Sequence, residues 1–283
     1  MGHCMYRVFI ILSLIIFSII AGSLFHKTRL HPRHPPLASS PIPSQVRPLS
    51  LSPPLESEEL PVYPWETLKG KGGKISPITK DYFRCKGSSL NQPIPVMKEG
   101  KVVENIFDCN GAESHSLPIR HDQEFVYPIL IELLNEIQSS TGKPVIITSG
   151  HRCPMHNHFV DSSPINQASK HQIGAEVSFY VAGLENSPEP VLNALFSFYK
   201  SNPKYAGEKK SYAEFERYDK ETDISTKPWF NKEIMVKYYK ANEARNGDNR
   251  HPFPHFSLQV RFDRDTNMRV AYSWKDAQQY HRK

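Results

Sequence analysis

Two segments of the chain alternate apolar and polar residues. Between 175 and 181 the odd-numbered residues are mostly apolar, and between 255 and 262 the even-numbered residues are apolar. A period of two is typical of a strand that buries one face. The β-branched run 145–148 predicts a third strand, bounded by Gly150.

Apolar residues at helical spacing predict the elements that cover these strands. The segment 125–137 carries an i, i+3, i+4 stripe, and Gly142 ends this helix before the strand at 145. Two further helices are predicted at 191–200 and 231–244, and a last strand at 270–274. The order of elements indicates an α+β domain with a small mixed or antiparallel sheet flanked by helices.

The polar faces of the two alternating strands form a candidate site. If these strands pair, four side chains can gather around one point: His171, Glu176, Ser178 and His255. The loop between 149 and 174 adds an arginine, a cysteine and further histidines. Loops held between strands commonly carry binding or catalytic residues.

Three motifs resemble signatures of the M15-type zinc D,D-peptidases, which cut terminal D-alanine or related bonds in peptidoglycan stem peptides. SGHRCPMHN at 149–157 resembles their SGYRSPxxN, SKHQIGAEVS at 169–178 resembles SxHxxGxAxD, and HFS at 255–257 resembles HxD. Their order and spacing agree over roughly residues 80 to 263. The resemblance implies the hedgehog and D,D-peptidase-like fold for residues 65–283.

The resemblance also implies roles for single residues. Arg152 would contact substrate, and His171 and His255 would bind zinc. The family's zinc aspartate falls on Ser178, and a neutral hydroxyl is a poor zinc ligand. Two further departures are that the general base falls on Pro252 and that the closing aspartate falls on Ser257.

Glu176 offers a replacement carboxylate, because it lies two residues before Ser178 and so on the same strand face. As a ligand it would complete a His2Glu zinc site, and the base would come from Asp161, Asp248 or elsewhere. As the base it would leave only two imidazoles for the metal. His251 competes with His255 as the last ligand but lacks the alternating strand context.

Two functions stay open. The first is a zinc-dependent D,D-carboxypeptidase-like hydrolase of peptidoglycan stem peptides, in which Arg152 and Glu176 act in catalysis and His171, Glu176 and His255 hold the metal. The second is a non-catalytic M15-like domain that has lost zinc and binds cell-wall peptide or a protein partner. In the second, Glu176 is a solvated strand residue.

The cysteines predict one disulfide. Cys85 and Cys109 flank a polar, proline-containing loop and are the natural pair in an oxidising compartment, which leaves Cys153 over. A separate cluster of Cys153 with the histidines beside it matches no zinc spacing. The loop histidines are expected to be exposed and to bind no ligand: His115, His121, His151, His156 and His158.

The first 64 residues differ from the rest. An apolar run at 8–25 predicts a signal peptide or membrane anchor within residues 1–25, and ten prolines between 31 and 64 predict a linker over 26–64. Export to the periplasm or cell envelope is expected, with an inner-membrane anchor if the run is uncleaved. Basic residues after the run favour the alternative, a tethered adaptor with a cytoplasmic domain.

Charge limits the partners. The chain carries a net charge of +6, which is too mild and too dispersed for a nucleic-acid-binding surface. The expected partners are therefore a peptidoglycan peptide and, through the N-terminal apolar segment, the membrane.

Overall fold

The computed structural model describes residues 75–163, 169–222, 224–243 and 251–272. All of its described elements lie within one unit, Glu59–Lys283. The predicted signal or anchor segment and the proline-rich linker lie outside the described residues. Among the residues that are described, no helix combines the length and apolar character needed to cross a membrane.

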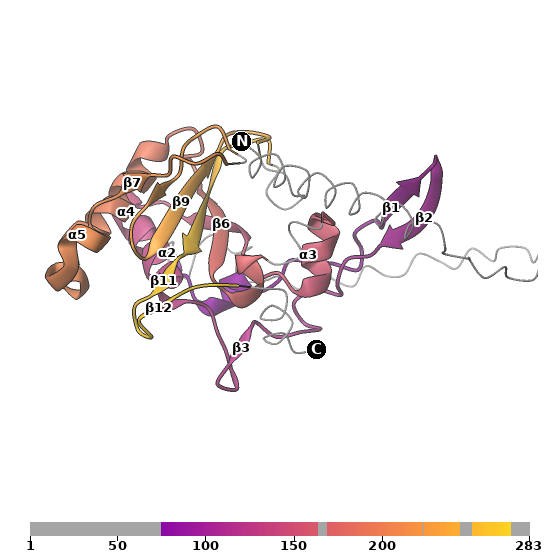
Figure 1. Ribbon diagram of the computed structural model, residues 1–283, viewed down its shortest axis with the longest axis horizontal. Coiled ribbons are helices and arrows are strands. Elements are labelled where there is room, and N and C mark those ends of the chain that lie inside the picture. The colour runs from indigo at the N-terminus through magenta and orange to yellow at the C-terminus, as the bar shows by residue number, and fades with distance from the viewer. Residues whose placement is uncertain (1–74, 164–168, 223, 244–250, 273–283) are drawn as a thin grey trace, which may run out of the picture. The chain divides into compact units, whose positions relative to one another are not determined.

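A six-stranded sheet lies at the centre of this unit (Figure 1). Its strands, all antiparallel to their neighbours, follow the order β5-β6-β10-β9-β8-β7. Their bounds are β5 Val145–Ser149, β6 Glu176–Val181, β7 Glu216–Arg217, β8 Trp229–Phe230, β9 Ile234–Tyr239 and β10 His255–Val260. The pairing predicted between the two alternating strands is confirmed, with Ser257 opposite Ser178 and Gln259 opposite Glu176.

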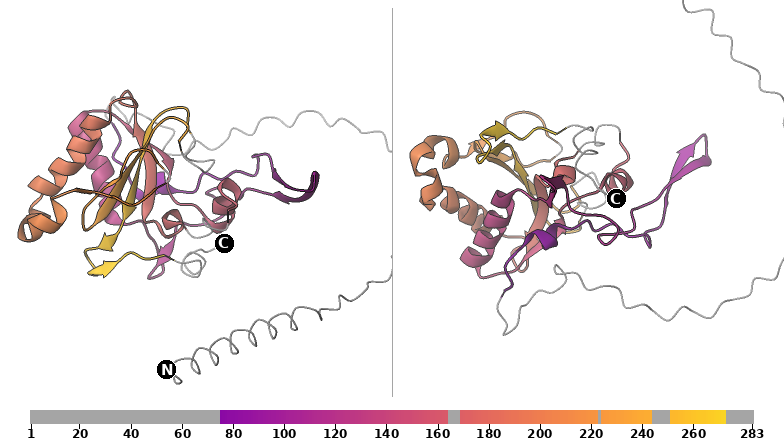
Figure 2. Two further views of the ribbon diagram at one scale, coloured as in Figure 1. Left: turned by 45° about the horizontal axis from the view of Figure 1, so that its top comes forward. Right: turned by 90° about the horizontal axis from the view of Figure 1, so that it is seen from below.

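Helices α2, Pro128–Thr141, and α4, Pro188–Ser201, cover one face of the sheet (Figure 2). Leu133 of α2 and Leu195 of α4 share one buried cluster with Phe179 of β6. Gly142 ends α2 with a left-handed φ of 64°, which a glycine adopts without steric cost. The predicted helices 125–137 and 191–200 are confirmed, with ends shifted by a few residues.

The shorter helical elements lie in the connections: η3 Lys80–Phe83, α3 Pro154–Val160, η5 Lys170–Ile173, η6 Pro203–Glu208 and α5 Lys209–Tyr212. Two-residue strands form two small hairpins: β3 Ile119–Arg120 with β4 Gln123–Glu124, and β11 Phe262–Asp263 with β12 Met268–Arg269. A longer hairpin joins β1, Ile94–Lys98, to β2, Lys101–Ile106. The α+β class with small antiparallel sheets is therefore confirmed.

Two predicted elements are wrong. The segment 231–244 contains strand β9 instead of a helix, because its backbone pairs with β10 on one side and β8 on the other. Ile234 and Val236 are fully buried within it, as a period-two pattern requires. Residues 270–272, the described part of the predicted last strand, are not in a strand, and the chain pairs earlier, at β12.

Candidate functional site

The polar face of β6 and β10 is buried instead of solvated. Glu176 is 7% exposed, and Ser178 and Ser257 are fully buried. Glu176 Oε1 accepts hydrogen bonds of 2.8 Å from Ser257 Oγ and from Gln259 Nε2. The expectation that Glu176 is a solvated strand residue in a non-catalytic domain is wrong, because strand register places Gln259 opposite it and Ser257 diagonally across on the same face.

The Glu176 carboxylate is an anion. Burial opposes its ionisation, but the charges of His171 and Lys237 and the two hydrogen bonds from β10 outweigh burial and lower its pKa to about 2. Glu176 is therefore ionised at neutral pH, beside positively charged neighbours. A buried anion needs cationic or metal partners to compensate its lost hydration.

His171 is held with one ring nitrogen toward that anion. A capping box between Ser169 and Gln172 fixes the short helix η5 that carries it. Its Nδ1 donates to the carbonyl oxygen of Gly150 at 2.6 Å, and its Nε2 lies 3.6 Å from Glu176 Oε1. Metal-binding histidines are commonly oriented in this way, with the outer nitrogen donating to a backbone carbonyl.

His255 lies at the start of β10 with 1% of its surface exposed. Its ring stacks on Tyr239 with centroids 4.7 Å apart and meets the edge of His251 at 5.0 Å. Burial and the neighbouring charge of His251 lower the pKa of His255 to about 4, so the imidazole is neutral at pH 7. A hydrogen bond with the backbone of Phe253 only partly offsets this lowering.

The structure brings the predicted residues together in part. His171 and Glu176 lie side by side, but the trio of His171, Glu176 and His255 is not among the groups of described side chains whose ligand atoms all lie within 4.8 Å of one another. Arg152 is 3% exposed, and its Nε donates to Ser149 Oγ at 2.8 Å. Asp161 caps the end of α3, and Asp248 lies outside the described residues.

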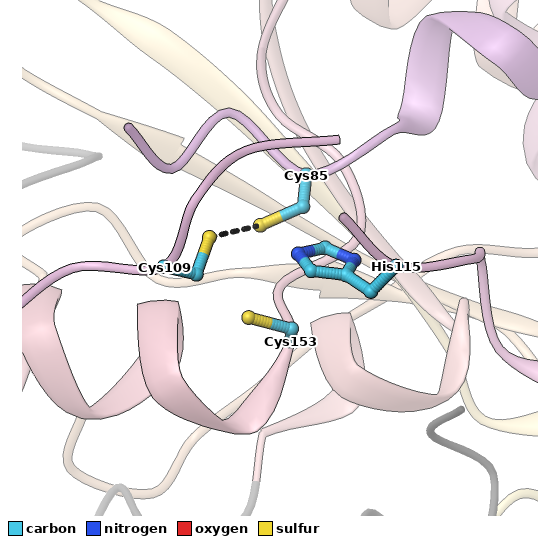
Figure 3. Close-up of side chains that lie close together, drawn as sticks. All are labelled: Cys85, Cys109, His115 and Cys153. Carbon is cyan, nitrogen blue, oxygen red and sulfur yellow. Dashed lines mark hydrogen bonds between the residues drawn. The ribbon is translucent and has the colours of Figure 1, made fainter. Parts of the chain in front are cut away.

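A second cluster, which the sequence did not predict, consists of Cys85, Cys109, His115 and Cys153 (Figure 3). One ligand atom from each of the four lies within 4.8 Å of those of the others. The three thiols are at most 3% exposed, and Figure 3 shows a ring nitrogen of His115 turned toward the sulfur atoms. These Cys and His side chains could hold a metal ion.

The predicted disulfide is wrong in this structure. Cys85 and Cys109 are neighbours, as expected, but both thiols are free and their Sγ atoms lie 3.8 Å apart. Cys153, which the sequence left unassigned, is their third neighbour. His115, predicted to be an exposed loop residue that binds no ligand, is only partly exposed and lies beside them.

Four separate segments deliver the cluster. Cys85 follows η3 and Cys109 follows β2, while His115 lies in the next turn. Cys153 is the N-cap of α3, and its Sγ accepts a hydrogen bond of 3.3 Å from the backbone N–H of His156. Because each of these four residues belongs to a different segment, no local spacing of cysteines and histidines in the sequence predicts the cluster.

The pKa values of Cys153 and Cys85 are shifted in opposite directions. Hydrogen bonds from Cys109 and Cys85 lower the pKa of Cys153 to about 3, despite burial, whereas burial raises that of Cys85. The lowered pKa favours the thiolate form of Cys153. Thiolates are the form in which cysteine binds metals.

Asp108 and His156 support the cluster from outside. His156 Nδ1 and Asp108 Oδ1 are 2.7 Å apart, and Asp108 Oδ2 accepts from Ser88 N and Asn91 Nδ2. Burial opposes ionisation of Asp108, yet the bond and charge of His156 outweigh it and lower the pKa of this carboxyl. His156, expected to be an exposed loop residue, is buried.

Comparisons with protein-family models, with curated proteins and with solved structures find no match to this chain.

Proposed function

We propose that the domain is a zinc-dependent hydrolase of the D,D-peptidase type that acts on peptidoglycan stem peptides. The observation that carries the proposal is the buried pair of His171 and Glu176. The separation of 3.6 Å between Nε2 and Oε1 is close to the ligand-to-ligand edge of about 3.4 Å in a tetrahedral zinc site with arms of about 2.0–2.1 Å. In this proposal Glu176 replaces the missing aspartate as the anionic ligand.

His255 supports the same assignment. Its imidazole is buried and neutral, and a neutral imidazole keeps one ring nitrogen with a lone pair that can bind a metal. Ser178 Oγ, fully buried on the same sheet face, has no hydrogen-bond partner among the described residues. A bound ion or water between the strands would satisfy this hydroxyl.

The substrate class comes from the three motifs. Zinc, when bound, would polarise the scissile carbonyl and lower the pKa of a water molecule. Arg152, in the first motif, would hold the terminal carboxylate of the peptide through two parallel hydrogen bonds. Export to the cell envelope follows from this substrate and from the apolar N-terminal run.

A second candidate is a non-catalytic domain that binds the same peptide. Ser178 and Ser257 favour it, because these two hydroxyls face each other where the family has two aspartates. Pro252 stands at the position of the general base and cannot transfer a proton. Ser257 and Gln259 of β10 both donate to Glu176 Oε1, so this oxygen is already engaged in hydrogen bonds that a metal ion would compete with.

The test is release of D-alanine from a pentapeptide ending in D-Ala-D-Ala, with the full chain loaded with zinc. We expect zinc-dependent release that falls at least about 100-fold in Glu176→Gln and in His171→Ala, because each removes a proposed zinc ligand and even loss of a group that only orients a ligand costs about 10- to 100-fold. Glu104→Gln, which removes an exposed carboxylate from β2, is the matched control and should keep full activity.

Binding of the same peptide, measured by calorimetry, separates the candidates. Tight binding without release by the wild-type chain would replace the hydrolase with the non-catalytic binder, and activity gained in Ser178→Asp would then identify the lost ligand. If the chain neither binds nor cleaves the peptide, both candidates are wrong.

A further inference from the structure

We propose that Cys85, Cys109, His115 and Cys153 bind one zinc ion in a closed structural site, separate from the centre at His171 and Glu176. The distances fit this ion. In a tetrahedral site with Zn–S bonds of about 2.3 Å, two sulfur ligands lie about 3.8 Å apart. Cys85 Sγ and Cys109 Sγ are 3.8 Å apart.

The ligand set selects the metal. Three thiolates and one imidazole form a Cys3His set, which is typical of structural zinc sites with four protein ligands and no open position. Soft sulfur ligands disfavour magnesium and calcium, which bind oxygen. Burial of the three thiols leaves little room for a substrate at this ion.

Hydrogen bonds with the surrounding backbone orient Cys153 and His115 as metal ligands. The backbone N–H of His156 already donates to Cys153 Sγ. His115 Nδ1 lies 3.4 Å from the carbonyl oxygen of Ser116, and a proton donated there leaves Nε2 to bind the metal. Outer hydrogen bonds of this kind orient the ligands of metal sites.

Gly87 shows how tightly the chain closes around the cluster. A Cβ atom at this position would lie 2.2 Å from Cys109 Sγ and 2.8 Å from Asp108 Oδ1. No side chain can occupy that space without moving the sulfur. The turn after Cys85 therefore requires glycine to let Cys109 approach.

The ion would close the base of the β1–β2 hairpin. In these two fully described strands Ile106 alone is buried, so the hairpin packs little apolar surface against the sheet. Cys85 precedes the hairpin and Cys109 follows it, while Cys153 lies next to Arg152 in the HRC motif. One zinc ion would thus link the segment around Cys85, which precedes the hairpin, to the loop that carries Arg152.

The test is the zinc content of the full chain after zinc loading under reducing conditions. We expect Cys85→Ser, Cys109→Ser and Cys153→Ser each to lose one zinc per chain. Cys4→Ser should keep the full zinc content. His171→Ala should keep the ion held by the cysteines, which is recognised by the thiolate-to-cobalt charge-transfer band after cobalt substitution, even where it loses the ion of the proposed hydrolase. Because His171→Ala removes only the centre of the proposed hydrolase, the two proposals can fail independently.

A measurement on the wild-type chain covers variants that fail to fold. Cobalt replacing zinc should show tetrahedral absorption bands and an intense thiolate-to-cobalt charge-transfer band. Zinc content unchanged by Cys153→Ser, or a cobalt complex without the thiolate band, would overturn the proposal. A Cys85–Cys109 disulfide in the zinc-loaded protein would do the same, because only two ligands would remain.

Discussion

Glu233 is a buried carboxylate outside both candidate sites. It is 2% exposed, and its Oε2 accepts hydrogen bonds from the hydroxyls of Tyr199 at 2.9 Å and Tyr205 at 2.7 Å. Burial raises its pKa and outweighs the two tyrosine bonds, which lower it. Folding therefore shifts this carboxyl toward its protonated form relative to the unfolded chain.

Glu233→Gln should stabilise the protein as the pH rises. A carboxyl whose folded pKa exceeds its unfolded value of about 4.3 contributes stability that is complete below that value and is lost as the pH rises through the folded pKa. The amide keeps an acceptor for both tyrosines and has no charge to bury. We expect the variant to match the wild type near pH 4 and to exceed it by about 1 kcal/mol at pH 7.

Urea unfolding at the two pH values measures this difference. Glu104→Gln, on an exposed strand position, should change stability by less than about 0.5 kcal/mol at either pH. A Glu233→Gln variant less stable than the wild type at pH 7 would show that the ionised carboxylate stabilises the fold.

Single residues also show what the sequence can say about the sites. The alternating pattern and the motifs placed Glu176 beside His171, because strand period and short loops are local properties. They did not show that Ser257 and Gln259 would bind Glu176, since this depends on a register between distant strands. The same limit hid His115, whose approach to three cysteines is set by the packing of four segments.

At the scale of elements, the hydrophobic pattern predicted the secondary structure correctly where an element carries a clear local pattern of its own. Helix α2 has a full apolar stripe and a glycine cap, and it was predicted. Strand β9, IMVKYY, has apolar residues that suit either period, so its state is decided by pairing with β8 and β10. Local propensity is a weak guide where a tertiary partner is already in place.

The β1–β2 hairpin should be dispensable for the sheet domain. Its apolar residues are largely exposed, with Met97 at 57% and Val103 at 57%. Asn91 Nδ2 donates to Asp108 Oδ2 at 2.7 Å, so the two ends of the hairpin already meet and a Gly-Ser-Gly link can replace residues 92–107. We expect the free energy of unfolding to change by no more than about 1 kcal/mol.

Urea unfolding and zinc content of this shortened chain check the prediction. Cys85 and Cys109 are retained, so the proposed zinc stoichiometry should be that of the full chain. A loss of several kcal/mol would mean that the hairpin packs on the domain more extensively than Ile106 alone allows.

At the scale of the whole molecule, one buried cluster joins the sheet to both long helices. It contains Leu133 of α2, Leu195 of α4, Val177 of β6 and Leu258 of β10, all fully buried. The opposite, polar face of β6 and β10 carries the centre at Glu176. The apolar face of the sheet is therefore buried against the helices, and the buried charged groups lie on the other face, where their lost hydration destabilises the fold unless they are paired.

Leu133→Ala should weaken the whole domain at once. Removing a fully buried leucine costs about 2–5 kcal/mol, because transfer free energy is lost and a cavity remains. Since one cluster connects the elements, near-UV and far-UV circular dichroism should shift together in urea and the zinc content should stay the same. Val103→Ala, 57% exposed on the hairpin, removes apolar surface without a cavity and should cost less than about 0.5 kcal/mol. Separate transitions in the two spectra would mean instead that the helices and the sheet unfold as independent units, and the shared cluster would not be what couples the candidate site to the rest of the fold.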